Sequence, residues 1–156
     1  MEKYCYNHDT TNCEIYGALY QWNEAMQYVA TPGTQGICPA GWHIPTYAEF
    51  QTFSSAVDGD GNALKAIGQG AGDGIGTNTS GFSALLAGGR TNLGSFYGLG
   101  GYAFFWSSTE GDAPYAGYLA LIGNYGVPRE IAENGLLKYF ESDKVQISGL
   151  IFSDYS

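Results

Sequence analysis

The stretch CPAGWHIPTYAEF, residues 38–50, places a cysteine and a histidine directly before a helix signal. Pro45 fixes the approach, Thr46 occupies the N-cap position, and Glu49 follows three residues later, which is the spacing of a capping box. Because these two polar residues are explained by helix capping, we interpret the stretch as a corner of the fold, with His43 as a partly exposed or hydrogen-bonded structural residue. The helix that begins here continues through apolar residues at helical intervals: Tyr47, Phe50, Phe53 and Val57.

The rest of the chain predicts one further helix and a run of strands. Apolar residues recur at spacings of three and four through residues 17–29, namely Leu19, Trp22, Ala25, Met26 and Val29, which is typical of an amphipathic helix. Strand-forming segments then follow one another, separated by Gly, Asn, Asp and Pro: residues 82–90, 102–110, 116–123, 136–140 and 145–152. Two helices followed by strands predict a single α+β domain, residues 1–156, with an antiparallel sheet.

Composition restricts the classes of partner. The 156 residues include 24 glycines, 13 tyrosines, 8 phenylalanines and 3 tryptophans, and the formal net charge is −9. An acidic surface repels a phosphate backbone, so nucleic acid is not an expected partner. No stretch reaches the roughly 18 apolar residues of a membrane span, and the opening MEKYCYN predicts no secretory signal.

The segment CYNHDTTNC spaces two cysteines across a polar, turn-forming run. This spacing favours a disulfide between Cys5 and Cys13, which places the chain in an oxidising, extracellular or cell-surface setting. Free thiols, or a zinc site completed by His8, Asp9 and Cys38, are the alternatives. Cys38 is the odd cysteine, which predicts either a buried thiol or a missing partner.

Residues 58–81 contain too many glycines for a regular element and predict a long loop with one short turn of helix. Asp58, Asp60 and Asn62 alternate as oxygen ligands do in calcium loops. An EF-hand also requires a bidentate Glu at its twelfth position, where this chain has Gln69, so that motif is excluded. No cofactor is expected; a looser calcium site remains an alternative to a simple polar turn.

Five motifs occur in one order: CYNHDTTNCEIYGALYQWNEAM, CPAGWHIPTYAEF, NALKAIG, NTSGFSALLAGGR and FWSSTE. This succession resembles the Fibrobacter succinogenes major paralogous domain, a family of secreted bacterial modules. The resemblance implies a C-type-lectin-like fold akin to the formylglycine-generating-enzyme type, with two helices on a small twisted antiparallel sheet and a long loop region that contacts ligands.

This chain departs from that family at both ends. Only residues 1–4 stand where members have a strand before the first cysteine, and the C-terminal cysteine of the family is missing. An unpaired strand would leave an open sheet edge. We therefore expect VQISGLIF, residues 145–152, either to fill the gap itself or to pair with a strand of another subunit.

The expected function is ligand binding without catalysis. The chemistry of the formylglycine-generating relatives needs late cysteines, and none follows Cys38. With only two histidines, the chain also has few candidates for the base of a Ser-His-Asp catalytic triad.

Exposed aromatic and polar residues suit a binding face for a glycan or a surface protein. The familiar sugar-and-calcium tripeptides Glu-Pro-Asn and Gln-Pro-Asp are absent. The alternatives are an adhesive or structural subunit of a surface assembly and a hypervariable receptor. The predicted contact residues are Asn92, Tyr97, Tyr102, Trp106, Ser108, Glu110, Asp112, Tyr115, Tyr118, Asn124 and Tyr125.

Overall fold

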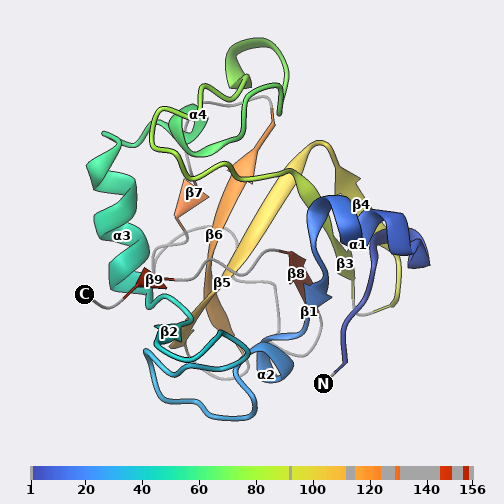
Figure 1. Cartoon of the computed structure of the whole chain (residues 1–156), viewed down its shortest axis with the longest axis vertical. Helices are drawn as coiled ribbons and strands as arrows, with labels where there is room; N and C mark the ends of the chain where they lie inside the picture. Colours follow the sequence, from blue (N-terminus) through green and yellow to red (C-terminus); the bar gives the residue numbers. More distant parts are fainter. Residues whose placement is uncertain are drawn as a thin grey trace.

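The computed structural model describes residues 2–91, 93–111, 115–123, 129–130, 145–148 and 153–154. Within these ranges the chain forms a small mixed domain of short helices and antiparallel strands (Figure 1). The helical segments are η1 (Tyr6–His8), α1 (Thr10–Tyr16), α2 (Trp22–Ala25), α3 (Tyr47–Ala56), α4 (Gly61–Leu64) and η2 (Gly72–Gly74). The strands are β1 (Leu19–Tyr20), β2 (Trp42–His43), β3 (Ala87–Thr91), β4 (Phe96–Leu99), β5 (Tyr102–Glu110), β6 (Ala116–Ile122), β7 (Arg129–Glu130), β8 (Val145–Ser148) and β9 (Ser153–Asp154).

The β5–β6 pair forms the centre of the domain. In Figure 1 it lies between α3 on one side and the β3, β4 and α1 region on the other. β7 pairs with the second edge of β6, and a separate sheet has the strand order β1, β8, β3, β4. β2 pairs with β9. All these pairings are antiparallel, as the run of short strands predicts.

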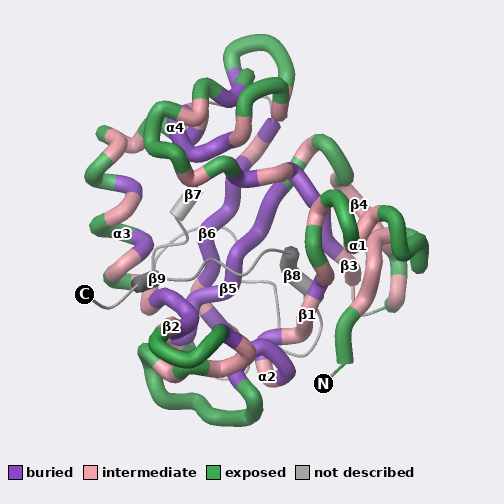
Figure 2. Tube along the Cα trace, viewed as in Figure 1, coloured by how far each residue is buried: buried purple, intermediate pink, exposed green. Residues whose placement is uncertain are grey.

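Both faces of the β5–β6 pair are covered, and both strands are mostly buried in Figure 2. Side chains alternate between the two faces of a strand, so neighbouring residues enter different clusters. One cluster joins the pair to α2 and the segment before α3; its members include Phe104, Trp106, Tyr118, Trp22, Met26, Cys38 and Ile44. The other cluster joins the pair to α3 and α4; its members include Phe105, Leu119, Leu121, Phe50, Leu64 and Leu86.

The capping box that the sequence predicts is present at the start of α3. The Thr46 hydroxyl accepts a hydrogen bond from the Glu49 N–H at 3.2 Å, and a Glu49 carboxylate oxygen accepts one from the Thr46 N–H at 2.7 Å. Two amides that a helix start would leave unpaired are therefore satisfied. The Tyr47 N–H also donates to the Thr109 hydroxyl at 3.0 Å, which joins the helix start to β5.

The prediction of a helix over residues 17–29 is wrong, because the helix here spans only Trp22–Ala25. Leu19 instead exchanges backbone hydrogen bonds with Tyr4, at 2.8 and 2.9 Å, and only the single turn α2 is helical. Gln27 and Tyr28 adopt left-handed backbone angles, with φ of 52° and 60°, which end the helix. Four residues of the predicted apolar stripe are buried all the same: Leu19, Trp22, Ala25 and Met26.

The strand predictions agree best in the centre. Residues 102–110 and 116–123 correspond to β5 and β6, whereas β3 begins later than the predicted start at residue 82, and β4 is an additional strand. The segment at 136–140 lies outside the described residues.

The C-terminal segment fills a gap within its own chain. Of the predicted strand at 145–152, residues 145–148 form β8, which pairs with β1 on one side and β3 on the other. These four residues thus pair within their own chain, as in the first of the two expected arrangements for VQISGLIF, and residues 149–152 lie outside the described residues.

The glycine-rich stretch at 58–81 is a loop that contains α4 and η2, close to the prediction. Backbone hydrogen bonds connect this loop to the residues that flank β5 and β6. The Ala71 N–H donates to the Gly123 carbonyl at 2.7 Å, and the Gly123 N–H donates to the Gly101 carbonyl at 2.8 Å. No helix among the described residues combines the length and the apolar character that crossing a bilayer requires.

Candidate functional site

The middle of the predicted contact stretch is core rather than surface. Trp106 is 5% exposed, Tyr118 is 3% exposed and Ser108 is 0% exposed. The expectation that these three residues contact a ligand at the surface is therefore wrong. Alternation within a strand implies that one face points outward, but here a second layer of chain covers each face.

The polar atoms of these buried residues form hydrogen bonds to neighbouring segments of the chain. The Trp106 ring N–H donates to the Tyr20 carbonyl at 3.0 Å. The Ser108 hydroxyl accepts a hydrogen bond from the Gly33 N–H at 2.8 Å and donates to the Pro45 carbonyl at 3.3 Å. Removal from water also raises the pKa of Tyr118, which keeps its phenol neutral. These groups stabilise the fold.

The accessible members of the predicted set lie at opposite ends of β5. Tyr102, 40% exposed, begins the strand near the half-buried Tyr97. Glu110 is exposed and ends the strand beside the half-buried Tyr115. At roughly 3.3 Å per residue the two ends are about 26 Å apart, so these residues do not form one compact site. The remaining predicted contacts, Asn92, Asp112, Asn124 and Tyr125, lie outside the described residues.

The residues proposed as calcium ligands, Asp58, Asp60 and Asn62, lie in the turn and cap at the start of α4. The Asp60 carboxylate accepts the Asn62 N–H at 2.9 Å as the N-cap of α4. The Asn62 amide donates to the Asp73 carbonyl at 2.8 Å, which ties α4 to the following loop. Asp58 lies in the turn before them, in a left-handed conformation. Across the ranges given above, no three His, Cys, Asp or Glu side chains group in a way that holds a metal ion.

His43 is a structural residue, as the sequence predicts. It is 5% exposed, and its Nε2 lies 2.9 and 3.0 Å from the two Glu49 carboxylate oxygens. Burial by itself would raise the pKa of Glu49, but hydrogen bonds from the Thr46 N–H and from His43 outweigh it and lower that pKa. The pair therefore reinforces the capping box.

Two other reactive groups are buried. Lys65 is 0% exposed and donates from Nζ to the Gly74 carbonyl at 2.5 Å and the Ile122 carbonyl at 2.9 Å. Its burial lowers the pKa of the ammonium group, against the attraction of Asp60. Cys38 is 4% exposed, and burial raises its pKa to about 11, so the thiol is protonated and unreactive at neutral pH.

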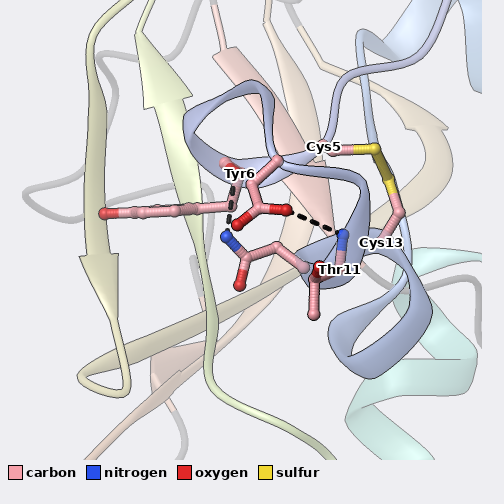
Figure 3. The surroundings of a disulfide bond; sticks show 6 residues. Cys5, Tyr6, Thr11 and Cys13 are labelled. Atoms are coloured by element: carbon pink, nitrogen blue, oxygen red, sulfur yellow. Dashed lines mark hydrogen bonds between the residues drawn. A yellow bond between two sulfur atoms is a disulfide. The ribbon is translucent and has the colours of Figure 1, made fainter.

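The disulfide between Cys5 and Cys13 is present, as the spacing predicts. Because the two sulfur atoms are bonded to each other, the alternatives of free thiols and of a zinc site at this pair are wrong. The closed loop contains η1 and the first turn of α1, a helix that the sequence analysis missed, with Asp9 as N-cap accepting the Thr11 N–H at 2.9 Å (Figure 3).

Figure 3 shows the Tyr6 ring directed away from the disulfide. It packs on β4, where the Tyr6 and Phe96 ring centroids are 5.2 Å apart. A Cβ at Gly88 would lie 2.9 Å from the Tyr6 ring, so glycine there allows the ring to approach β3 closely. The loop is thereby packed onto the β3–β4 hairpin, and its His8 ring lies 5.0 Å from Phe96.

A second set of aromatic and charged side chains lies beside this loop, with Glu2 and Tyr28 exposed and Glu24 buried at 9% exposure. The Tyr28 hydroxyl donates to the Glu24 carboxylate, the Glu2 N–H donates to the same carboxylate at 2.8 Å, and the Tyr4 hydroxyl donates to the Glu2 carboxylate. The Tyr28 and Glu2 hydrogen bonds lower the pKa of Glu24, so it is ionised at neutral pH.

The contacts continue onto the hairpin, where the Arg90 guanidinium carbon lies 4.2 Å from the Tyr4 ring centroid and 5.4 Å from that of Phe96. We call this set the aromatic strip: Glu2, Tyr4, Glu24, Tyr28, Arg90 and Phe96. Sequence analysis missed it because its members lie far apart in the chain and share no motif.

Comparison with curated proteins finds short matches to carbamoyl phosphate synthase small chains. The Phaeosphaeria nodorum arginine-specific small chain is 39% identical over 77 residues, 42% of this chain and 16% of that protein. The Metallosphaera sedula small chain is 53% identical over 34 residues, 22% of this chain and 9% of that protein. The chain thus spans less than a fifth of the length of these relatives.

Comparison with solved structures finds no significant match. The family model of the Fibrobacter succinogenes major domain, in contrast, matches residues 1–144, which is most of the chain. The chain belongs to the Fibrobacter succinogenes major domain family.

Proposed function

We propose that this domain is a non-catalytic ligand-binding module that acts outside the cell or at its surface, on a C-type-lectin-like scaffold. The observation that supports it best is a contrast in exposure. His43, Lys65 and Cys38 are buried within the fold, while the aromatic rings of Tyr28 and Tyr102 remain at the surface. Tyr28 is 73% exposed and Tyr102 is 40% exposed.

The absence of catalysis is proposed from what the reactive groups do. His43 binds Glu49, Lys65 binds two carbonyl groups, and Cys38 is a buried thiol with a raised pKa. A general base or nucleophile must reach a substrate atom within hydrogen-bonding distance. Side chains that are at most 5% exposed do not meet that requirement.

The extracellular setting is proposed from the disulfide. Structural disulfides persist in oxidising compartments and are rare where thiols are kept reduced. The closed loop bears Tyr6 and His8, which pack on Phe96. The disulfide thus supports a surface that a binding module would use.

The lectin-like scaffold is proposed from the architecture. A twisted antiparallel pair, helices beside it and a long irregular loop are the parts that such a fold requires. The same proposal includes no resident cofactor, since Asp60 and Asn62 already cap α4 and close its loop.

Binding and turnover, measured together, test this function. The full chain is screened against immobilised neutral glycans, acidic glycans and cell-surface proteins, with and without EDTA, while the soluble phase is assayed for released product. We expect saturable binding that EDTA leaves unchanged and no product. Product formation that is lost in a His43→Ala variant, or the absence of binding to every ligand, contradicts the proposal, and binding abolished by EDTA restores the calcium alternative.

A further inference from the structure

We propose that the aromatic strip is the ligand site and that its ligand is a neutral polysaccharide; this inference rests on the proposed binding function and deepens it. The strip begins at Tyr28, just after α2, and ends at Phe96 on β4. Its six residues come from three separate parts of the chain. Hydrogen bonds and cation–ring contacts join each member to the next, so the fold itself assembles the surface.

The strip presents rings together with hydrogen-bonding groups. Tyr28 is 73% exposed, Glu2 is exposed, and Tyr4 and Phe96 are half-buried. Half-buried rings are fixed by packing and still offer surface to a partner. Sugar rings need this combination, because their C–H faces pack on aromatic rings while their hydroxyl groups seek acceptors and donors.

The chemistry of the carboxylates suits a polyhydroxylated ligand. Each carboxylate oxygen accepts more than one hydrogen bond, so the exposed Glu2 carboxylate can accept from a ligand as well as from the Tyr4 hydroxyl. Glu24 is 9% exposed and instead orients Tyr28 and the Glu2 backbone. Hydroxyl groups of a sugar supply the donors. Arg90, which lies over Tyr4, supplies N–H donors at the other end of the strip.

Several features hold the strip in place before a ligand arrives. The Tyr28 N–H donates to the Asn23 carbonyl at 2.9 Å, and the Tyr28 hydroxyl donates to Glu24. At the other end, the Cys5–Cys13 disulfide fixes the loop that packs against Phe96. A surface ordered in advance loses less conformational entropy on binding, which favours affinity.

Charge decides between neutral and charged ligands. The formal net charge is −9, and the only Lys and Arg residues before residue 124 are Lys3, Lys65 and Arg90. Lys65 is buried, and Arg90 lies over two aromatic rings. An acidic polymer would be repelled. Residues 25–48, which include Tyr28, contain no Asp, Glu, Lys or Arg. Of the two carboxylates in the strip only Glu2 is exposed, so a cationic partner finds a single exposed carboxylate there.

The ligand class is tested with the full chain and defined polymers. Calorimetry or affinity electrophoresis is run with cello-oligosaccharides, galactomannan and xylan as neutral probes, polygalacturonate as the acidic probe and poly-L-lysine as the cationic probe. We expect a neutral polymer to bind with an affinity that changes less than about twofold between about 0.05 and 0.5 M salt, since no ion pairs are screened. Binding of polygalacturonate or poly-L-lysine alone overturns the proposed ligand class.

The location of the site is tested with matched exposed residues. In Tyr28→Ala we expect the affinity for the neutral polymer to fall about fivefold to tenfold, because the exposed ring is lost. Tyr28→Phe keeps the ring and should stay within about threefold. Ile67→Ala and Ile75→Ala remove exposed side chains outside the strip and should leave the affinity unchanged; these residues are 80% and 51% exposed.

The outcomes separate this inference from the function on which it rests. If Tyr102→Ala abolishes binding while Tyr28→Ala retains it, the strip is not the site, although the domain is still a binding module. If the intact chain binds no probe and no surface protein, both proposals fail. Phe96→Ala, checked for folding by circular dichroism, provides a second variant at the opposite end of the strip, and wild-type affinity in both Tyr28→Ala and Phe96→Ala overturns the inference.

Discussion

The β5–β6 pair and the aromatic strip use the same residue types in opposite environments. In the pair, Trp106 and Tyr118 lie on regular strands whose two faces are both covered, and they are 5% and 3% exposed. In the strip, Tyr28 follows a single helical turn in a left-handed conformation and is 73% exposed. Regular strands align side chains for packing, whereas an irregular turn can hold a ring outward. An aromatic-rich stretch therefore does not by itself mark a binding surface.

The largest expected effect is on the buried side of this comparison. Trp106→Ala removes a buried indole and its hydrogen bond to the Tyr20 carbonyl. We expect the free energy of unfolding in urea to fall by about 3–5 kcal/mol. Tyr28→Ala is the matched control and should change it by about 0.5 kcal/mol or less, as exposed positions do. Equal losses of unfolding free energy in the two variants would contradict the contrast between a buried Trp106 and an exposed Tyr28.

The second effect concerns the loop next to the strip. Replacing Cys5 and Cys13 by serine opens a closed loop with a sequence separation of 8 residues. The entropy of so short a loop corresponds to about 2–3 kcal/mol of stability. Unfolding with and without a thiol reductant measures it. Cys38→Ala is the control: reductant should still lower its stability, because the Cys38 thiol is free and takes no part in the disulfide. If reductant no longer lowered the stability of Cys38→Ala, the Cys5–Cys13 pairing would be contradicted.

Sequence patterns predicted the segments whose structure is decided locally. Thr46 and Glu49 specify a helix start by their spacing alone, and the structure has the capping box. The Cys5–Cys13 disulfide was also predictable, since the polar, turn-forming residues between the two cysteines favour a chain reversal that brings them together. The β5 segment was recognisable because nine residues of strand-forming type stand between glycines and turns.

The errors occur where distant contacts decide the structure. The helical spacing through residues 17–29 was overridden when Leu19 paired with Tyr4. The burial of Trp106 depends on α2 and on the segment before α3, and one strand's alternation does not reveal which segments cover it. The strip joins residues 2–4, 24–28 and 90–96, and a single sequence contains no signal for such a juxtaposition.

A third prediction concerns the pH dependence of stability at Glu49, in the capping box of α3. The folded pKa of Glu49 is below its usual value of about 4.3. Its stabilising contribution is therefore fully present above that value and is lost as the pH falls through the folded pKa. Glu49→Gln retains a capping side chain that does not ionise, so we expect a loss of about 1 kcal/mol or less at neutral pH.

That difference should shrink as the pH is lowered from about 6 to about 3. Urea unfolding of both proteins across this range measures it. Thr46→Ser is the control, because it preserves the hydroxyl that accepts the Glu49 N–H and should follow the wild-type pH dependence. A gap between wild type and Glu49→Gln that widens in acid would contradict the assigned direction of the pKa shift.

The smallest expected effect is on the exposed side, at the residue before Tyr28. Gln27 has a φ of 52°, a conformation that glycine adopts freely and other residues at a cost. Gln27→Gly relieves that cost, but it also loosens the unfolded chain and removes the bond from the Gln27 amide to the Glu24 carbonyl at 2.8 Å. We expect these terms to offset, with a change in unfolding free energy of about 0.5 kcal/mol or less.

Affinity for the neutral polymer should nevertheless fall about threefold in Gln27→Gly, because Tyr28 loses part of its fixed orientation. The Asp58→Gly variant makes the same kind of replacement at another left-handed position, with a φ of 53°, and should bind as wild type does. Wild-type affinity in Gln27→Gly, together with the loss expected in Tyr28→Ala, would mean that the ring matters and its preset orientation does not. The exposed ring would then adapt to its ligand, unlike the buried rings of Trp106 and Tyr118, which are fixed by packing.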